Sequence, residues 1–324
     1  MKVSIISGGA GFVGSNLIKY LQAEGRHVFV IDNMCRGSSS FLGVNSGVDD
    51  SLISILNADC TDQAILYDFF DSARNVGHVD EVWHLAANSD IPAGIADANV
   101  DLKDTFMTTF TLLEAMKLFK VGTINFASSS AIYGDFGGLP IHEEIGPLLP
   151  ISNYGAMKLA SEALISAATE SHLERANIFR FPNVVGVPAT HGVILDFIGR
   201  LVVEPELLTV LGDGSQQKAY LHVSDLISAM LLVRSQKMLK KIELVNIGPI
   251  DEGITVRSIA QLVIERVSPA AMIKFGEGNK GWLGDVSKFS YSTKRLQSYG
   301  WLPTLDSRGA VIRAVDEIAL QLGQ

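Results

Sequence analysis

A glycine-rich turn near the N-terminus constrains the fold of this chain more than any other feature. Gly8, Gly11 and Gly14 follow the apolar run 3–6, and the turn that they form leads into an amphipathic stretch over 13–23. Gly8 permits a tight turn, Gly11 lets the backbone approach a pyrophosphate, and Gly14 allows a helix to pack closely on a strand. The first turn of that helix offers free amides and a partial positive charge to phosphates. This context predicts a dinucleotide-binding turn.

Short apolar runs recur through the first 180 residues and alternate with amphipathic stretches. Each run is apolar nearly throughout, which is typical of parallel strands that are buried on both faces. The alternation of strand and helix predicts an α/β fold with a doubly wound parallel sheet. The expected strands cover 3–6, 28–31, 82–85, 124–127 and 178–181, and the expected helices include 13–23, 64–74 and 105–119.

The alternation of strands and helices changes after Asn183, where prolines and a glycine turn interrupt the chain. A strand at 219–223, a helix at 225–236 and a strand at 243–247 are expected to return to the main sheet. We therefore expect a dinucleotide-binding (Rossmann) domain and a smaller, discontinuous C-terminal lobe that binds the substrate. The expected domain is 1–183 plus about 219–249, and the expected lobe is about 184–218 and 250–324.

Acidic residues after two of the strands are candidates for holding the adenosine part of a dinucleotide. Asp32 ends the second strand, eighteen residues after Gly14. A carboxylate there accepts hydrogen bonds from a ribose 2′-hydroxyl and repels a 2′-phosphate, which favours NAD over NADP. Arg36 lies close by, and its positive charge would instead favour the 2′-phosphate of NADP. Asp59 follows the run 52–57, where it either contacts the adenine edge or lies solvated in a loop.

Tyr154 and Lys158 are four residues apart, which puts both side chains on one face of a helix. A phenol has a pKa near ~10 and is a poor base at neutral pH. A nearby ammonium and an oxidised nicotinamide both favour the phenolate. Such a tyrosine can remove a proton from a sugar hydroxyl. Taken alone, the pair is more often a solvated helix face, and the upstream glycine turn favours the catalytic interpretation.

Three serines, 128–130, follow the strand expected at 124–127. Open α/β sheets bind ligands at the carboxyl ends of their strands. One of the three hydroxyls is therefore expected to bridge Tyr154 and the substrate oxygen. The alternative is a polar loop without a function. The histidines lack metal-ligand spacing, and so do Cys35 and Cys60, so no metal is expected.

The composition and the apolar runs of the chain bear on its partners and its localisation. The net charge of −9 disfavours nucleic acid and anionic membranes as partners. No run of 18 apolar residues is present and the N-terminal apolar stretch is too short for a secretory signal, so we expect a cytoplasmic protein.

These motifs together resemble the extended short-chain dehydrogenase/reductase family, and within it the NAD-dependent nucleotide-sugar epimerases and dehydratases. The resemblance covers nearly the whole chain. It places the catalytic Ser/Thr of the family on Ser129, beside Tyr154 and Lys158. The positions that the resemblance implies for NAD binding, the catalytic pair included, are Gly8, Gly11, Phe12, Val13, Gly14, Asp32, Asn33, Arg36, Asp59, Cys60, Leu85, Ala86, Ala87, Tyr154 and Lys158.

The resemblance also implies a nucleotide-diphosphate sugar as substrate, bound by Ser129, Ser130, Asn183 and Lys218. Lys218 stands where the family usually has arginine, so the bidentate fork is lost there. Thr105 stands where an asparagine is usual. The family also implies a homodimer, for which helices around 105–119 and 154–169 would suit an interface.

One departure from the family pattern bears on the reaction. Dehydratases of this family carry an Asp-Glu pair directly after the catalytic residue, where this chain has Ser130 and Ala131. Elimination then lacks its acid and base. The chain is most similar to the UDP-glucose 4-epimerases, which implies inversion at C4 of the hexose through a transient 4-keto intermediate. A 4-ketoreductase or dehydrogenase, a 2-epimerase, a 4,6-dehydratase or a non-catalytic NAD-binding regulatory protein remain as alternatives.

Overall fold

The structure is a computed structural model that describes residues 1–43, 47–137, 139–237, 239–278 and 290–324. The chain divides into two compact units. The first unit comprises 1–134, 148–180 and 230–245, and the second comprises 135–147, 181–229 and 246–324. Within the part of the chain that is described, no helix combines the length and the apolar character that crossing a bilayer requires.

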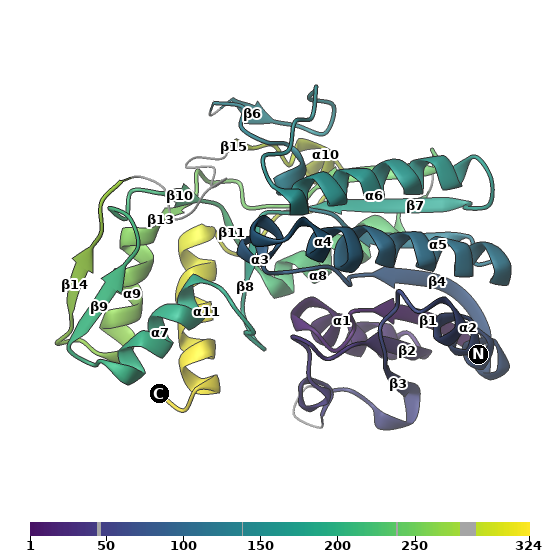
Figure 1. Cartoon of the computed structure of the whole chain (residues 1–324), viewed down its shortest axis with the longest axis horizontal. Coiled ribbons are helices and arrows are strands. Elements are labelled where there is room, and N and C mark those ends of the chain that lie inside the picture. Colours follow the sequence, from purple (N-terminus) through teal and green to yellow (C-terminus); the bar gives the residue numbers. More distant parts are fainter. Residues whose placement is uncertain (44–46, 138, 238, 279–289) are drawn as a thin grey trace. The chain divides into compact units, whose positions relative to one another are not determined.

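The first unit is built on a seven-stranded sheet in the order β12-β7-β5-β4-β1-β2-β3 (Figure 1). The pairs from β7 through β3 are parallel. The strands are β1 (Lys2–Ser7), β2 (Arg26–Asp32), β3 (Ile53–Asn57), β4 (His78–His84), β5 (Thr123–Ala127), β7 (Arg175–Arg180) and β12 (Ile242–Asn246). The doubly wound parallel sheet is thus confirmed, and the strand at 243–247 does return to it.

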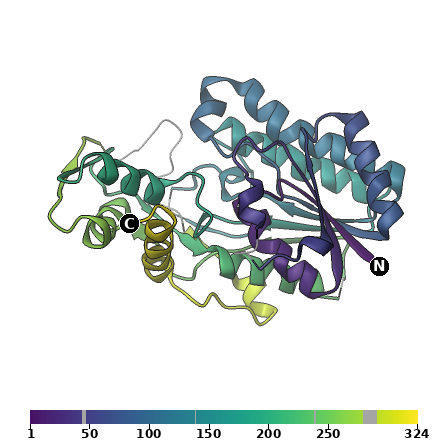
Figure 2. The same ribbon diagram turned by 90° about the horizontal axis from the view of Figure 1, so that it is seen from below.

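Helices cover both faces of this sheet, so that the first unit has three layers (Figure 2). One face buries Val3, Ile5 and Phe126 against apolar side chains of α2, α5 and α6. The helices are α1 (Phe12–Ala23), α2 (Gln63–Val76), α3 (Ile91–Ala96), α4 (Ala98–Asp101), the π-helical segment η4 (Leu102–Met107), α5 (Thr108–Phe119), α6 (Asn153–Thr169) and α8 (Val223–Ser235), with α8 ending in this unit and beginning in the other.

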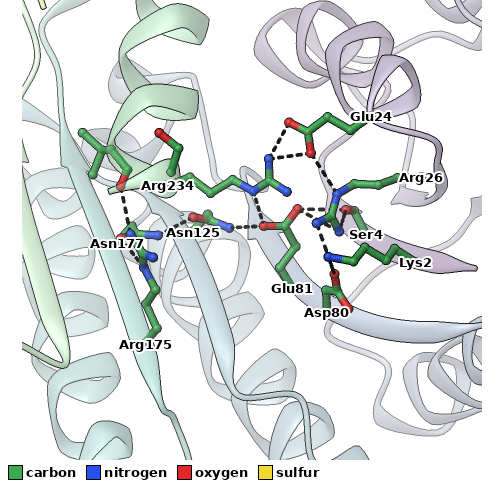
Figure 3. A network of polar contacts seen from close by, with 12 residues as sticks. Lys2, Ser4, Glu24, Arg26, Asp80, Glu81, Asn125, Arg175, Asn177 and Arg234 are labelled. Atoms are coloured by element: carbon green, nitrogen blue, oxygen red, sulfur yellow. Dashed lines mark hydrogen bonds and ion pairs between the residues drawn. The ribbon is translucent and has the colours of Figure 1, made fainter. Parts of the chain in front are cut away.

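The opposite face carries a buried polar row that crosses four strands (Figure 3). Glu81 of β4 is 3% exposed and accepts hydrogen bonds from Ser4 of β1 (2.9 Å) and Asn125 of β5 (3.2 Å). Asn177 of β7 donates to Asn125 (2.7 Å). Arg234 of α8 donates to Glu81 at 2.7 Å and so ties that helix to the sheet. The Glu81 carboxylate can carry its charge in this buried place because it is hydrogen-bonded and paired with an arginine.

The sheet order places a topological switch between β1 and β4, because the chain crosses the sheet after β3. Open α/β sheets bind ligands outside the carboxyl ends of their strands at such a point. The glycine turn follows β1, and the segment 85–90 follows β4. Both candidate cofactor segments therefore lie at the switch point.

The second unit has its own apolar core, formed by Ile198, Leu208, Ile259 and Val311 among others. Among its described residues, four two-stranded ladders accompany the helices. Its described elements are β6 (Pro140–Ile141), β8 (Asn183–Val185), α7 (Val193–Val203), β9 (Leu207–Val210), β10 (Gln217–Lys218), β11 (Tyr220–His222), β13 (Ile254–Thr255), α9 (Val256–Val267), β14 (Met272–Phe275), β15 (Ser290–Tyr291), α10 (Lys294–Ser298) and α11 (Ser307–Gln321).

Two details differ from the sequence-based expectations. The strand expected at 219–223 does not return to the main sheet, because β11 pairs in parallel with β8 of the second unit. The second unit contains four segments that the expected Rossmann domain includes, namely 135–147, 181–183, 219–229 and 246–249. The helix expected at 105–119 begins as the π-helical segment η4 and becomes α-helical at Thr108.

Candidate active site

The glycine turn joins β1 to α1 and leaves the start of that helix open. Gly8 has a φ of 72°, and a Cβ there would lie 2.7 Å from the amide nitrogen of Ala86. A Cβ on Gly14 would collide with the backbone of Gly9. Gly11 is the N-cap of α1, and no side chain caps the helix. The first-turn amides, those of Phe12 included, thus fit a diphosphate group.

Asp32 lies at the end of β2, beside the glycine turn. Its carboxylate accepts hydrogen bonds from the amides of Ala10 (3.0 Å) and Met34 (2.9 Å). Burial raises its pKa, and these two hydrogen bonds oppose the rise. Asn33 forms a local turn by accepting from the Cys35 amide at 3.1 Å. The carboxylate is thereby fixed where a dinucleotide ribose is expected.

The other residues expected around the adenosine have more constrained roles. Asp59 accepts from Thr61 and forms an ion pair with Lys103 at 2.9 Å. The Cys60 thiol is buried in the apolar core, and burial raises its pKa to about 12, so its side chain is inert. Of Cys60, only the backbone is therefore left to contact a bound dinucleotide.

The segment 85–87 continues β4 past the switch point. The Leu85 amide donates to the Ser7 carbonyl at 3.0 Å, and Ala86 packs against Gly8. Leu85, Ala86 and Ala87 are each half-buried. Small residues at 86 and 87 leave the backbone accessible to a ligand beside the turn.

Tyr154 lies in the first turn of α6, whose N-cap Ser152 accepts from the Gly155 amide at 3.1 Å. Gly155 lets the helix approach the segment that follows β5, because a side chain there would collide with the Ala131 carbonyl. This close approach brings the Tyr154 phenol beside the side chain of Ser129, which acts to lower the pKa of the phenol.

The three serines have different surroundings. Ser129 is half-buried, and its oxygen also accepts from the Ala131 amide at 3.1 Å. Ser128 is 1% exposed and donates to the Glu162 carboxylate. Ser130 begins the short 3-10 turn after Ser129. Among the three, Ser129 is therefore the serine whose side chain lies beside the phenol.

Lys158 lies one turn after Tyr154 and is 2% exposed. Its ammonium donates to the Ala127 carbonyl at 2.6 Å and lies 5.9 Å from the centroid of the Tyr154 ring. Burial lowers the pKa of Lys158 to about 7, against the opposing charge of Glu162. Burial raises the pKa of Tyr154 to about 12, and Asp101 adds to the rise while Ser129 opposes it. The expected lowering of the Tyr154 pKa by Lys158 is therefore not found in the protein alone.

A buried ion pair supports α6 from behind. Glu162, one turn after Lys158, accepts from two nitrogens of Arg180 at the end of β7, at 3.0 and 2.6 Å. Arg180 also donates to the Tyr133 hydroxyl at 3.0 Å. The bidentate pair and the Ser128 hydroxyl satisfy the buried carboxylate, so that it holds α6 against the strand ends. In the sequence, the signal that could have indicated Glu162 is its spacing of one helical turn from Lys158.

A second chain of hydrogen bonds joins β1, β4, α5 and α6. Ser7 lies 2.7 Å from the His84 Nδ1 atom, and Thr109 lies 2.9 Å from its Nε2 atom. Thr109 donates to Ser161 of α6 at 3.0 Å. Burial and the charge of Lys158 lower the pKa of His84 to about 3, so it is neutral at physiological pH. His84 thus connects the strand before the glycine turn to the helix that carries Lys158.

A buried carboxylate near Tyr154 carries no signal in the sequence. Asp101 is fully buried, and its Oδ1 atom accepts from Asn88 at 2.9 Å. Its Oδ2 atom lies against Gly94 without a hydrogen-bond partner among the described residues. Thr105 accepts from the Asn88 amide at 3.2 Å, so this position does anchor a backbone group.

Asn183 and Lys218 both belong to the second unit. Asn183 begins β8 and is exposed, and its side-chain amide lies 3.5 Å from the Ala219 carbonyl. Lys218 lies in β10, opposite Ile254 of β13. Among the described residues, no group of three or more acidic, histidine or cysteine side chains is arranged to hold a metal ion.

Comparison with known proteins agrees with this geometry. Residues 4–248 match the family described as "NAD dependent epimerase/dehydratase family". A putative UDP-glucose 4-epimerase of Methanocaldococcus jannaschii is 26% identical, over 96% of this chain and 97% of that protein. The crystal structure of a UDP-galactose 4-epimerase is 32% identical with a TM-score of 0.85 and covers 99% of this chain and 100% of that one.

The structure of the UDP-glucose 4-epimerase of Thermus thermophilus, solved in complex with NAD, is 26% identical with a TM-score of 0.84 and covers 98% of this chain and 99% of that one. The matched region contains the glycine turn, the Ser129–Tyr154 pair and Lys158. With the uncapped helix and the fixed Asp32 carboxylate, these matches show that the chain belongs to the NAD-dependent epimerase/dehydratase family and that its cofactor is NAD.

Proposed function

We propose that this chain is an epimerase that inverts C4 of a nucleotide-diphosphate hexose through a transient 4-keto intermediate. The observation that carries the proposal is that Tyr154 shares the first turns of α6 with the buried Lys158 and lies beside the side chain of Ser129. A phenol and a hydroxyl held together in this way can share the proton of a single sugar hydroxyl.

In this mechanism the protein binds, orients and moves a proton. The amides of 11–14 hold the diphosphate of NAD, Asp32 holds its adenosine ribose, and Lys158 orients its nicotinamide ribose. When bound, NAD supplies the acceptor and the donor of hydride, and its oxidised ring adds the positive charge that favours a Tyr154 phenolate. The Tyr154 oxygen takes the proton of the C4 hydroxyl and later returns it, while Ser129 orients the sugar oxygen.

The second unit is proposed to hold the nucleotide diphosphate through Asn183 and Lys218. A firm hold on the nucleotide and a loose hold on the hexose would let the keto sugar turn about its diphosphate linkage. Return of hydrogen to the other face of C4 then inverts its configuration.

The carboxylates near Tyr154 argue for epimerisation over elimination. Ser130 and Ala131 stand where a dehydratase has its acid and base. Asp101 is fully buried, and Glu162 is 5% exposed and bound to Arg180. Neither is available to protonate a leaving group on a substrate, so loss of water lacks its proton-transfer groups.

We also propose that the chain forms a homodimer through α5 and α6, which pack against each other. Phe110 and Leu118 of α5 are 41% and 57% exposed, large for apolar side chains on one helix. Analytical ultracentrifugation tests this proposal, because a dimer has twice the mass of 34.9 kDa.

The function is tested by incubating the protein and NAD with UDP-, GDP-, CDP- and dTDP-hexoses and assigning the products by NMR. The proposal predicts a C4 epimer from at least one of them without net formation of NADH. Net oxidation or reduction of the nicotinamide would indicate a reductase or dehydrogenase. A 6-deoxy-4-keto product would indicate a dehydratase, and inversion at C2 would indicate a 2-epimerase.

The control is Tyr154→Phe, which should abolish turnover while nucleotide-sugar binding persists. Near-normal turnover by this variant would exclude Tyr154 as the base. If NAD binds but none of the nucleotide hexoses reacts, a non-catalytic NAD-binding protein becomes the better interpretation.

A further inference from the structure

Arg36 lies close to the carboxylate that is expected to select the cofactor. It follows Asp32 by four residues, in a segment that folds back over the glycine turn. A Cβ on the next residue, Gly37, would lie 2.8 Å from the Ala10 carbonyl carbon and 3.1 Å from the Asp32 Oδ1 atom. An arginine in this place is the usual partner of the 2′-phosphate of NADP. Judged by its position alone, Arg36 would therefore weaken the preference of the site for NAD over NADP.

The Arg36 guanidinium is instead bound to a carboxylate. Its Nη2 atom lies 2.7 Å from the Oδ2 atom of Asp90, in the segment that follows β4. Because β1 lies between β2 and β4 in the sheet, this ion pair connects the two segments that flank the glycine turn. Both side chains are partly exposed, at 44% and 38%, so the pair remains within reach of a ligand phosphate and of salt.

Asp90 is held in place by its own hydrogen bonds. Its Oδ1 atom caps α3 by accepting from the Ala93 amide at 3.0 Å. Its amide donates to Asn88 at 2.8 Å, and the Asn88 side chain donates back to the Asp90 carbonyl at 2.8 Å. Asn88 is itself anchored to the buried Asp101. A fixed carboxylate loses little conformational entropy when it binds Arg36, which makes the pair more persistent than most exposed ion pairs.

A second cation beside this segment is neutralised in the same way. Lys103 lies 2.9 Å from Asp59, a carboxylate that Thr61 holds in place. The charges of Asp32 and Asp104 also act on Cys35, the neighbour of Arg36. A 2′-phosphate, which carries about −1.5 to −2 charges at neutral pH, would thus meet carboxylates and two cations that are already paired.

We propose that Asp90 is a specificity-determining residue for the cofactor: by binding Arg36, it withholds this guanidinium from a 2′-phosphate and so favours NAD over NADP. The inference rests on NAD binding at the glycine turn and is independent of the reaction that the chain catalyses. A guanidinium and a phosphate form strong bidentate hydrogen bonds, so release of Arg36 should be seen directly in affinity for the 2′-phosphate.

Asp90→Asn tests this proposal with little structural change. Asparagine has the same shape, keeps the oxygen that caps α3 and is as good an N-cap as aspartate, but loses the charge that binds Arg36. The dissociation constants of NAD and NADP, and of the fragments 5′-AMP and 2′,5′-ADP, are measured by calorimetry at one fixed ionic strength. The ratio of the NADP constant to the NAD constant should fall about tenfold in the variant.

The double variant Arg36→Gln/Asp90→Asn should restore the ratio of the unaltered chain, because the gain acts through Arg36. Asp316→Asn is the matched control: it breaks an exposed ion pair with Arg266 of 2.9 Å in the second unit and should leave the ratio unchanged. An unchanged ratio in Asp90→Asn, or a gain that persists without Arg36, would overturn the proposal. Absence of dinucleotide binding by the unaltered chain would overturn it together with the cofactor assignment, whereas loss of epimerisation alone would leave it standing.

Discussion

The side chain of Ser129 lies beside the phenol of Tyr154, whereas the neighbouring Ser128 donates a hydrogen bond to the buried carboxylate of Glu162. Two adjacent hydroxyls of the same strand end thus have separate roles. One lies beside the proposed base, and the other belongs to the support of α6. This difference leads to the first prediction.

Ser129→Ala should lower kcat about a hundredfold, because the variant loses the group that orients the sugar oxygen and the phenol. Ser128→Ala should instead destabilise the protein by about 1–3 kcal/mol, because it leaves a buried carboxylate short of one hydrogen bond. Steady-state kinetics and urea unfolding of both variants separate the two roles. Equal losses of kcat in the two variants would contradict the assignment of Ser129.

The buried ammonium of Lys158 should make stability depend on pH in the alkaline range. The folded state has a pKa of about 7 for this group, against a value of 10.5 for an unperturbed lysine. Between these values the unfolded chain binds a proton that the folded chain does not, so the free energy of unfolding rises with pH. Below pH 7 the lysine is charged in both states, and the cost of burying the charge applies in full.

Lys158→Met removes this dependence. From about pH 7 to about pH 10, the stability of the unaltered chain relative to the variant should rise, with the ratio of unfolding constants changing by up to about tenfold per pH unit. Urea unfolding at several pH values across this range measures it. A constant difference between the two proteins would show that Lys158 keeps an ordinary pKa.

Gly8 and Gly25 provide a matched pair of left-handed glycines. Their φ angles are 72° and 74°, but a Cβ on Gly8 would collide with Ala86 whereas one on Gly25 would meet nothing within 4 Å. Both alanine variants should lose about 1 kcal/mol to backbone strain. Only Gly8→Ala should also weaken NAD binding, by more than about tenfold, because the turn must shift where it approaches the pyrophosphate. Calorimetric titration with NAD would contradict this site if the two variants bound alike.

Glu81 should be the most sensitive acidic residue of the polar row. It is 3% exposed and pairs with Arg234 (2.7 Å) and Arg26 (3.5 Å), so Glu81→Ala leaves two guanidinium groups without their buried partner. We expect a loss of about 3–5 kcal/mol in urea unfolding. Glu24→Gln, which alters the exposed end of the same network, should cost under about 1 kcal/mol. Similar losses for the two variants would contradict the role of the buried row.

Much of the fold and the site could be predicted because the relevant signals are local in the sequence. The continuous apolar runs indicated the parallel strands, and the glycine turn lies within one strand–turn–helix unit. Tyr154 and Lys158 share a helix face through their spacing. The strand expected at 219–223 pairs with β8 and not with the main sheet, because a three-residue strand does not indicate its partner in the sequence and this pairing depends on the packing of the second unit.

The contacts that the sequence does not reveal join residues that are separated along the chain. Arg36 and Asp90 are 54 residues apart, and Glu162 and Arg180 come from a helix and a strand that only the folded sheet brings together. The sequence does not distinguish Asp101 from the other acidic residues, and only the structure shows that it is fully buried. The π-helical turn at Leu102–Met107 is a change of hydrogen-bond register, which has no marker in residue type.

The central claim is that the hydrogen of C4 leaves and returns within one bound complex while Tyr154 carries the proton. It is tested most directly with UDP-galactose, or with the nucleotide hexose that the panel identifies, deuterated at C4. NMR and mass spectrometry of the product should show the C4 epimer with its deuterium retained, and no net NADH should form. A product whose C4 deuterium has been replaced by solvent hydrogen, or no epimer from any nucleotide hexose, would contradict the account.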